Sequence, residues 1–284
     1  EDALCRDLMS MPVGDIPDIV SAWRHQGPQI RGIAFALDCA WHILNSQHEG
    51  VPISTLLGGP AYGEVPEVLS LSAGPPDALI RQIRDNQGAN RVIQIKLGLE
   101  PIKDDLECVQ QILSVLDVEQ VLLADFNGAL PAATALGALP TLTDPGLLWE
   151  EPCKTLDDNI AVAKALDGQM LFDTCLTELD AFSQVIAAGA KAVAIKPALM
   201  GGLAVARTAR DLCVAAGLNI RIDGPWSGQI AASAALSLAI GVPADRMIGS
   251  IDLTQPLDTE CDRILKSRPG WVGVDDMHKR APPV

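Results

Sequence analysis

The stretch VAIKPALMGG (residues 193–202) ends an apolar run in a lysine and follows it with a proline and a glycine pair. Val193, Ala194 and Ile195 are typical of a strand that is buried on both faces, as in a parallel sheet. A charged residue at the end of such a strand is unusual. The position of Lys196 therefore raises the question of what stands at the ends of the other strands.

Similar short aliphatic runs recur along the chain and alternate with segments of helical periodicity. This alternation predicts a parallel sheet with helices outside it, and eight strands at this spacing favour a (β/α)8 barrel. A doubly wound open sheet is the alternative, but the first run is followed by AGPPD and not by a glycine-rich fingerprint. The predicted strands are Val68–Ser72, Val92–Lys96, Val121–Asp125, Leu147–Glu150, Met170–Asp173, Ala192–Lys196, Asn219–Asp223 and Met247–Asp252.

Seven of the eight predicted strands end in charged residues, which lie 23 to 29 residues apart, about one strand–helix unit each. In a barrel of this kind the active site lies at the carboxyl ends of the strands, so these side chains should open onto one mouth. The residues are Lys96, Asp125 with Asn127, Glu150 with Glu151, Asp173, Lys196, Asp223 and Asp252.

Three consecutive predicted strands present the carboxylates Asp125, Glu150 and Asp173. Unpaired, they would repel one another strongly in a partly buried site. A hard divalent cation removes that conflict, and all-oxygen ligation suits Mg²⁺. The alternative is that each acidic residue caps the helix that follows its strand, although glutamate is a poor cap. The pattern favours a Mg²⁺ site.

Lys96 and Lys196 flank the three carboxylates, one strand before and one strand after them. A lysine beside a cation and another lysine should have a lowered pKa and serve as a base near neutral pH. The pair could remove a proton α to a carboxylate, giving an ene-diolate that a divalent ion stabilises. Return of a proton gives racemisation or epimerisation, and loss of a β-substituent gives elimination. The alternative is that Lys196 pairs with Asp173 or Asp223, or extends out of the barrel.

Composition excludes several other functions. The chain has 284 residues, is 48% hydrophobic and carries a formal net charge of −15. Nucleic acid and anionic membrane surfaces both attract clustered Lys and Arg, so neither is an expected partner. The apolar stretch Ile230–Val242 is too short to span a bilayer and predicts a buried helix. Seven cysteines without a C-x-x-C pair favour a reduced, cytoplasmic protein.

Taken together, five motifs resemble the enolase superfamily, in its mandelate racemase and muconate lactonizing enzyme branch. The resemblance implies that Asp125, Glu150 and Asp173 bind Mg²⁺ and that Lys96 and Lys196 are the acid/base pair. It favours the two-lysine, muconate lactonizing type, because no histidine lies near the ends of the sixth or seventh strand. The motifs are IQIKLG (93–98), ADFNG (124–128), WEEP (149–152), LFDT (171–174) and AIKPALMGGL (194–203).

The resemblance extends to the helical segment IRGIAFALDCAWHILNSQHEGVPISTLLGG (30–59) and has three departures. Residues 1–62 resemble the helical end of the family's capping domain, and residues 63–284 resemble the barrel with a tail that returns toward the cap. The first departure is that the N-terminal strands of the capping domain are absent from this chain. The family's K-x-K becomes Gln94-Ile95-Lys96, so the lysine that contacts the substrate carboxylate is replaced by Gln94. Thr174 stands where an acidic residue often follows the fifth-strand Asp.

The expected substrate is a small carboxylate of the amino-acid type, such as a proline derivative, an N-acyl amino acid or a dipeptide. Gln94, Asn127, Asp223 and Asp252 are the candidate substrate-binding residues. Racemisation or epimerisation is the favoured reaction, and dehydration of a β-hydroxy acid such as a hydroxyproline is the alternative. A Schiff-base aldolase barrel or a non-catalytic relative would also place a lysine on a strand. Assembly as a homo-oligomer is expected.

Overall fold

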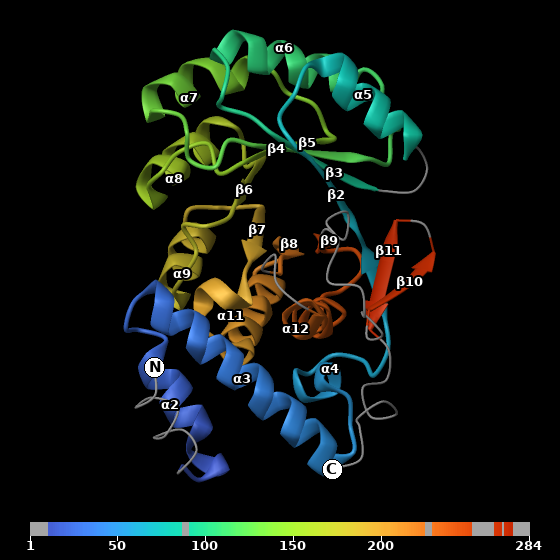
Figure 1. Cartoon of the computed structure of the whole chain (residues 1–284). Helices are drawn as coiled ribbons and strands as arrows, with labels where there is room; N and C mark the ends of the chain where they lie inside the picture. Colours follow the sequence, from blue (N-terminus) through green and yellow to red (C-terminus); the bar gives the residue numbers. More distant parts are fainter. Residues whose placement is uncertain (1–10, 87–90, 225–228, 252–263, 269, 275–284) are drawn as a thin grey trace.

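The computed structural model describes residues 11–86, 91–224, 229–251, 264–268 and 270–274 (Figure 1). Its central feature is an eight-stranded sheet in which each strand lies beside its neighbour in sequence and all pairs are parallel. This confirms the predicted (β/α)8 barrel. The strands are β2 (Val68–Leu71), β3 (Val92–Lys96), β4 (Val121–Asp125), β5 (Leu147–Glu150), β6 (Met170–Phe172), β7 (Ala192–Ile195), β8 (Asn219–Ile222) and β9 (Met247–Ser250).

Helices follow the barrel strands and cover the outside of the sheet (Figure 1). Helix α5 begins with Pro76 at the first turn, where the missing N–H costs no hydrogen bond. A short helix, α10 (Pro197–Met200), also follows Lys196 directly. The covering helices are α5 (Pro76–Asp85), α6 (Ile102–Leu113), α7 (Ala132–Ala138) with the turn η2 (Leu139–Thr141), α8 (Leu156–Ala165), α9 (Leu179–Ala187), α11 (Leu203–Ala215) and α12 (Gln229–Ala239).

The barrel strands are apolar on both faces, and alternate residues belong to two separate clusters. The larger cluster joins the outer face of the sheet to the helices and includes Trp149 and Phe172. The smaller one fills the barrel interior and consists of Val68, Val92, Leu123, Leu171, Ala192 and Ala194. Towards the carboxyl ends of the strands the interior becomes polar, with Gln94, Glu150 and Arg221 buried there. The apolar layer thus forms the floor of a polar mouth.

The segment before the barrel is helical, as predicted, and packs against it. It contains η1 (Val13–Asp15), α2 (Ile16–Trp23), α3 (Pro28–Glu49) and α4 (Ile53–Leu56). Helix α3 contacts α10, α11 and α12, and in Figure 1 it crosses the lower part of the molecule beside them. Phe35 and Ile53 belong to the same hydrophobic cluster as the barrel helices. The proposed boundary between 1–62 and 63–284 stays a prediction. Among the described residues, no helix combines the length and apolarity that crossing a membrane requires.

A three-stranded antiparallel sheet beside the barrel was not predicted. It has the order β1 (Glu64–Pro66), β11 (Trp271–Val274), β10 (Ile264–Arg268). Strand β1 leads almost directly into β2, and the backbone N–H of Glu67 donates to the carbonyl of Gly270 at 2.9 Å. Glu67 also forms an isolated parallel bridge with Ser250, which joins the first and last barrel strands. The small sheet therefore sits at the seam where the barrel closes.

Asp38 of α3 links the helical segment to the barrel. Its buried Oδ2 accepts hydrogen bonds from the backbone N–H groups of Leu203 and, at 3.2 Å, Ala204. These groups are the free donors at the start of α11, whose own N-cap residue, Gly202, has no side chain to pair with them. Asp38 thus caps a helix from another part of the chain.

Replacing Asp38 with alanine is expected to lower the free energy of unfolding by about 2–4 kcal/mol, since it leaves two buried donors unpaired at a helix N-terminus. Urea denaturation followed by circular dichroism measures this loss. Asp18→Ala, in the exposed first turn of α2, is the control and should change stability by less than about 0.5 kcal/mol. An equal effect of both substitutions would contradict the capping role.

Candidate active site

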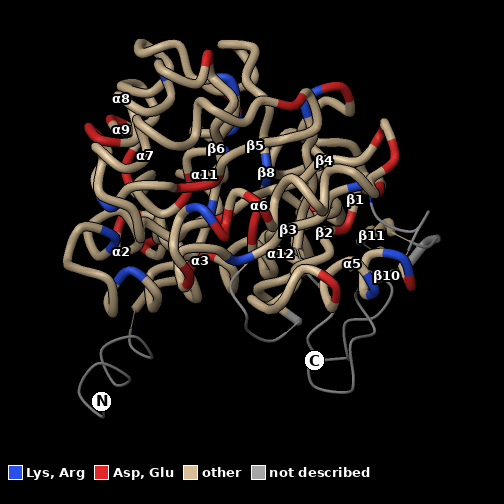
Figure 2. Tube along the Cα trace, turned by 90° about the horizontal axis from the view of Figure 1, so that it is seen from above, with Lys and Arg blue, Asp and Glu red and all other residues tan. Residues whose placement is uncertain are grey.

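The charged residues predicted at the strand ends lie together at the carboxyl ends of the parallel strands. Figure 2 shows basic and acidic positions in the middle of the trace as well as at its edge. Lys96, Asp125 and Glu150 are the last residues of β3, β4 and β5, and in the sheet Lys96 pairs with Asp125 and Asp125 with Glu150. Asp173, Lys196 and Asp223 each follow the last residue of their strand. Asp252 lies outside the described residues.

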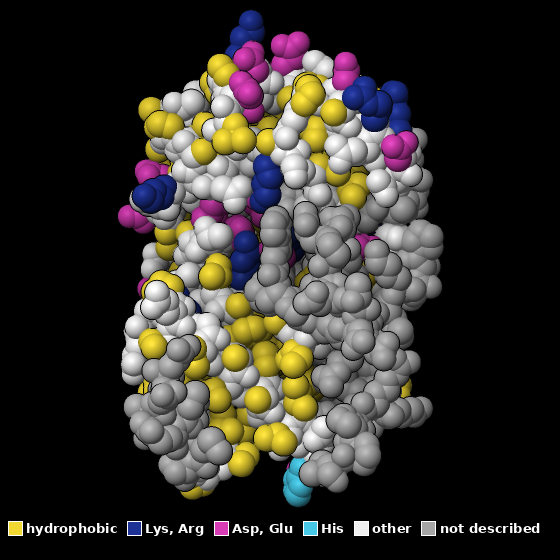
Figure 3. Space-filling model, in the orientation of Figure 1, with side chains coloured by type: hydrophobic (Ala, Val, Ile, Leu, Met, Phe, Trp, Pro, Cys, Tyr) yellow, Lys and Arg dark blue, Asp and Glu magenta, His cyan; other side chains and the backbone are white. Residues whose placement is uncertain are grey.

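A cavity of about 430 Å³ opens above these strand ends. Basic and acidic side chains lie together in the middle of the face shown in Figure 3. Both predicted catalytic lysines and three of the predicted substrate-binding residues line the cavity. The lining residues are Gln94, Lys96, Asn127, Lys196, Ala198, Leu199, Arg221, Asp223 and Gly224.

Lys96 is paired with the first of the three carboxylates. Its Nζ donates to Oδ2 of Asp125, and its side chain remains 32% exposed while that of Asp125 is buried. The other oxygen of Asp125, Oδ1, accepts from the backbone N–H of Asn127 at 2.8 Å. Asn127 has a positive φ of 47°, a conformation that asparagine tolerates better than most residues. This turn holds the carboxylate in place and leaves the lysine accessible from the cavity.

Glu150 is fully buried and accepts hydrogen bonds from two neighbours. Nε2 of Gln94 donates to its Oε2 at 2.7 Å, and Nη1 of Arg221 lies 3.1 Å from Oε1 and 3.4 Å from Oε2. Gln94 is itself oriented by Ser70, whose hydroxyl donates to Oε1 of Gln94 at 2.9 Å. Burial raises the pKa of Glu150 above its usual value, and the positive charge of Arg221 opposes this.

Lys196 bridges two acidic residues. Its Nζ lies 2.7 Å from Oδ2 of Asp173 and 3.4 Å from Oδ2 of Asp223, and its side chain is 23% exposed. Burial alone would lower the pKa of Lys196, but the negative charges of Asp173 and Asp223 outweigh it and raise the pKa above its usual value. The expectation of a lowered pKa for Lys196 is therefore wrong for this arrangement, because its close neighbours are carboxylates.

The helix-capping alternative for the acidic residues does not hold in the structure. The N-cap residues of α7, α8 and α9 are Pro131, Thr155 and Glu178. Asp125, Glu150 and Asp173 instead lie among the site's basic groups and Gln94. Their position is thus explained by the site and not by the helices that follow.

Glu151 supports the site from behind and was not predicted to do so. It has a positive φ of 40°, which turns the chain directly after Glu150. Its Oε2 accepts from the backbone N–H of Asp173 at 2.7 Å, and its Oε1 accepts from Thr174 Oγ1 at 3.1 Å and Cys175 N at 2.9 Å. Glu151 thereby fixes the loop that carries Asp173. The second acidic residue of WEEP is the only sign of this role in the sequence.

Arg221 was also missed. The pattern NIRI places it between two isoleucines that face the helices, so it must face the barrel interior. A charged residue at an interior position of a buried strand is the signal that could have revealed it. Nη2 of Arg221 also lies 3.4 Å from Oδ2 of Asp223.

The donor atoms allow a test of the predicted metal site. Carboxylate oxygens are ligands that suit Mg²⁺, and Oδ1 of Asp173 is buried with no hydrogen-bond partner. A buried oxygen of this kind is costly unless a cation or donor faces it. Within the described part of the chain, however, no three His, Cys, Asp or Glu side chains are grouped as they would be around an ion. The donor set fits Mg²⁺ in its chemistry, while basic neighbours engage Asp125 and Glu150.

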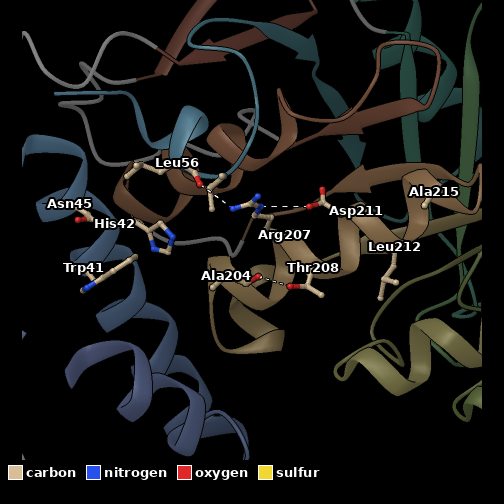
Figure 4. Close-up of a pocket in the computed structure, with 11 residues that line it drawn as sticks. Trp41, His42, Asn45, Leu56, Ala204, Arg207, Thr208, Asp211, Leu212 and Ala215 are labelled. Atoms are coloured by element: carbon tan, nitrogen blue, oxygen red, sulfur yellow. Dashed lines mark hydrogen bonds and ion pairs between the residues drawn. The ribbon is translucent and has the colours of Figure 1, made fainter. Parts of the chain in front are cut away.

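A second cavity, of about 650 Å³, lies between α3, α4 and α11 and away from the strand ends (Figure 4). Its polar side chains serve the packing of these helices. Arg207 donates to the carbonyl of Leu56 at 3.2 Å and lies 3.5 Å from Asp211, and Thr208 donates to the carbonyl of Ala204 at 3.1 Å. None of these contacts positions a group for acid/base chemistry.

Comparison with known proteins agrees with this architecture. The sequence model of the family described as "Enolase C-terminal domain-like" matches residues 77–272, more than half of the chain. A cis-3-hydroxy-L-proline dehydratase of Roseibium aggregatum is 27% identical over 248 residues, which are 84% of this chain and 65% of the relative. An o-succinylbenzoate synthase of Escherichia coli is 29% identical over 235 residues, 80% of this chain and 68% of the relative.

Among solved structures, an enolase superfamily member from Roseovarius nubinhibens complexed with magnesium superimposes with a TM-score of 0.78 and 28% identity. The match covers 84% of this chain and 66% of that protein. The chain thus spans slightly less than two thirds of the length of this structure and of the dehydratase. By its matched sequence and its fold, the chain belongs to the enolase C-terminal domain-like family, in the mandelate racemase and muconate lactonizing enzyme branch of the enolase superfamily.

Proposed function

We propose that this chain is the catalytic barrel of an enzyme that removes a proton α to a carboxylate, with Lys96 and Lys196 as its acid/base pair. The observation that carries the proposal is the placement of these lysines. They stand at the ends of β3 and β7, which are four strands apart in a barrel of eight, and both line the same cavity. A carbon held between them is approached from opposite faces.

Each lysine is positioned by a carboxylate. Asp125 holds Nζ of Lys96, and Asp173 together with Asp223 holds Nζ of Lys196. Both amino groups remain partly exposed to the cavity, so each is accessible to a bound substrate. One lysine takes the proton from the α-carbon, and the other returns a proton to the opposite face or protonates a leaving group.

Asp125, Glu150 and Asp173 are the residues proposed to hold Mg²⁺. When bound, the ion supplies positive charge to the substrate carboxylate, on which negative charge grows as the α-proton leaves. The all-carboxylate donor set and the unpaired oxygen of Asp173 support this assignment. The magnesium reported with the related Roseovarius nubinhibens structure supports it as well.

The polar residues that line the cavity favour a substrate of the amino-acid type. Oδ2 of Asp223 lies 3.4 Å from Nζ of Lys196, and this carboxylate offers a negative charge for a substrate ammonium group. Asn127 lines the cavity as well and offers a neutral amide group. Gln94 also lines it, but its amide is bonded to Ser70, Asp125 and Glu150. Proline derivatives, N-acyl amino acids and dipeptides remain the substrate classes proposed. Asp252, the remaining candidate, stays a prediction.

Racemisation or epimerisation is the proposed reaction, because the two lysines line one cavity from strands that are four apart in the barrel. Dehydration is a second candidate, favoured by the relative that is a cis-3-hydroxy-L-proline dehydratase. In that reaction one lysine takes the α-proton, the C–O bond at the β-carbon breaks, and the hydroxyl group leaves as water with a proton from the other lysine. The two reactions share the first step and differ in whether the substrate carries a β-hydroxyl group.

The test is α-proton exchange in D₂O, followed by NMR with the full chain and Mg²⁺ across amino acids, proline and 3-hydroxyproline isomers, N-acyl amino acids and dipeptides. We expect exchange with at least one compound, its loss on addition of EDTA and its return with excess Mg²⁺. Inverted configuration in the recovered substrate indicates an epimerase, and an enamine or keto product indicates a dehydratase. Exchange that survives complete chelation would show that the metal assignment is wrong.

Borohydride distinguishes the proposal from a Schiff-base aldolase. An aldolase lysine becomes covalently attached to a carbonyl substrate on reduction, and the mass of the protein then increases. We expect no such increase with any compound that undergoes exchange. Trapping at Lys96 or Lys196 would favour the aldolase.

A further inference from the structure

Arg221 is a buried cation inside the barrel, at the level of the candidate metal ligands. Its side chain is 3% exposed, and Glu150, which it contacts through Nη1, is 1% exposed. Removing both charged groups from water costs free energy that only good pairing offsets, so a buried arginine at this position is destabilising by itself. Its presence calls for an explanation that the acid/base chemistry of the two lysines does not give.

The barrel interior has room for this long side chain because the neighbouring strand carries small residues. Ala194 of β7 pairs with Arg221 of β8, and Ala192 lies two residues earlier on the same interior face. A larger residue at either position would occupy space that the arginine uses to reach Glu150 on β5. The packing of β7 thus allows the guanidinium to cross the interior.

Four carboxylates, from the ends of four different strands, attract the guanidinium. Nη1 contacts Glu150 and Nη2 contacts Asp223, while Asp173 and Asp125 attract it through their charge. Burial alone would lower the pKa of Arg221, but these four negative charges raise it, and the side chain stays charged. Its Nε has no hydrogen-bond partner, so the position of the guanidinium is set by its two Nη groups.

The Arg221 guanidinium therefore lies against the carboxylate oxygens that a divalent cation would need as ligands. Both oxygens of Glu150 lie within 3.4 Å of Nη1, and Nε2 of Gln94 donates to Oε2 as well. A metal ion bound to these oxygens would share one carboxylate with the guanidinium, and the two positive charges would repel each other at short range.

We propose that Arg221 is a built-in counter-cation of the metal site, which neutralises Glu150 when no divalent ion is bound and has to move away from this carboxylate when Mg²⁺ binds. The proposal rests on the proposed function, in which Glu150 is a metal ligand. Two consequences follow. The metal-free barrel is stabilised by Arg221, and its affinity for Mg²⁺ is lower than the three carboxylates alone would give.

The test compares Mg²⁺ binding in the wild type, Arg221→Met and Arg221→Gln, at one fixed pH, by isothermal titration calorimetry. Removing the competing charge is expected to tighten Mg²⁺ binding at least about tenfold in both variants. Melting temperatures in EDTA and in excess Mg²⁺ give an independent readout. Both variants should melt below the wild type in EDTA and recover most of that difference with Mg²⁺.

Arg210→Met is the matched control. Arg210 is another buried arginine, 3% exposed, but it lies on α11 and donates to the carbonyls of Leu57 and Leu238 and to Asp211. Its loss should lower the melting temperature equally with and without Mg²⁺ and leave the affinity for the ion unchanged. Arg221→Lys, which keeps the charge, should bind Mg²⁺ closer to the wild type than to Arg221→Met.

The outcomes separate this inference from the proposed function. Unchanged or weaker Mg²⁺ binding in Arg221→Met and Arg221→Gln would overturn the counter-cation role while leaving the metal site intact. Failure of both variants to fold even in excess Mg²⁺ would also contradict it, because the bound ion should replace the lost charge. Absence of Mg²⁺ binding in the wild type and in both variants would instead count against the metal assignment itself.

Discussion

Replacing Lys196 with alanine is expected to slow α-proton exchange by about 10²–10⁴-fold, the range that a positioned acid or base contributes. Among the described residues that line the cavity, Lys96 and Lys196 are the two lysines, and Lys196 is the one that follows β7. The loss should therefore be seen as a lower rate of exchange in D₂O, while the variant still binds Mg²⁺. NMR measures the first quantity and calorimetry the second.

Lys191→Ala is the control for this prediction. Lys191 is a largely exposed lysine immediately before the same strand, and its Nζ lies 3.4 Å from Oδ2 of Asp167. Its removal should leave exchange unchanged. Lys96→Ala should slow exchange as strongly as Lys196→Ala, but for protons on the opposite face of the α-carbon. Retained exchange in Lys196→Ala, or loss of Mg²⁺ binding in either variant, would refute the assigned roles.

Replacing Glu150 with glutamine is expected to lower the free energy of unfolding by about 3–5 kcal/mol, because it leaves a buried arginine without its carboxylate. Each contact of Glu150 described above is accepted from Gln94 or Arg221, so an amide nitrogen placed there would face donors. Urea denaturation of the metal-free protein measures the loss. The affinity for Mg²⁺ should fall as well, since one proposed ligand is gone.

Two comparisons make the Glu150 prediction specific. Glu178→Gln makes the same chemical change at a partly exposed residue that pairs with Arg24 and Arg31, and should cost only about 1 kcal/mol or less. Combining Glu150→Gln with Arg221→Met should recover part of the lost stability, because the unpaired charge is removed together with its partner. Additive losses in the double variant would contradict direct pairing of the two residues.

The barrel could be predicted from sequence because its strands are short, apolar and evenly spaced. β3, β4 and β5 have the predicted bounds, and the other five barrel strands end one or two residues earlier than expected. The sheet of β1, β10 and β11 could not be predicted in the same way. Its strands pair residues that are far apart in the sequence, such as Glu64 with Gly273, and no local pattern specifies such a pairing.

The candidate site was predictable where position along a strand decides the role of a residue. Lys96, Asp125 and Glu150 end their strands, so their location at the mouth follows from the fold. Contacts across the barrel were not predictable, because they depend on which side chains from opposite strands meet. Arg221 reaches Glu150 across the interior. The raised pKa of Lys196 has the same origin, since its nearest charges come from the neighbouring strands.

The seam of the barrel has a consequence for folding during synthesis. Glu67 and Ser250 form the bridge between the first and last barrel strands, and Glu67 also pairs with Gly270. These contacts join residues roughly two hundred positions apart. Their formation is slow because closing so long a stretch of chain costs conformational entropy. A ribosome has to release residues beyond Gly270 before the seam can form. Until then, the first barrel strand keeps an unpaired edge. We expect the nascent chain to depend most on chaperones during the time between synthesis of this strand and release of the residues beyond Gly270.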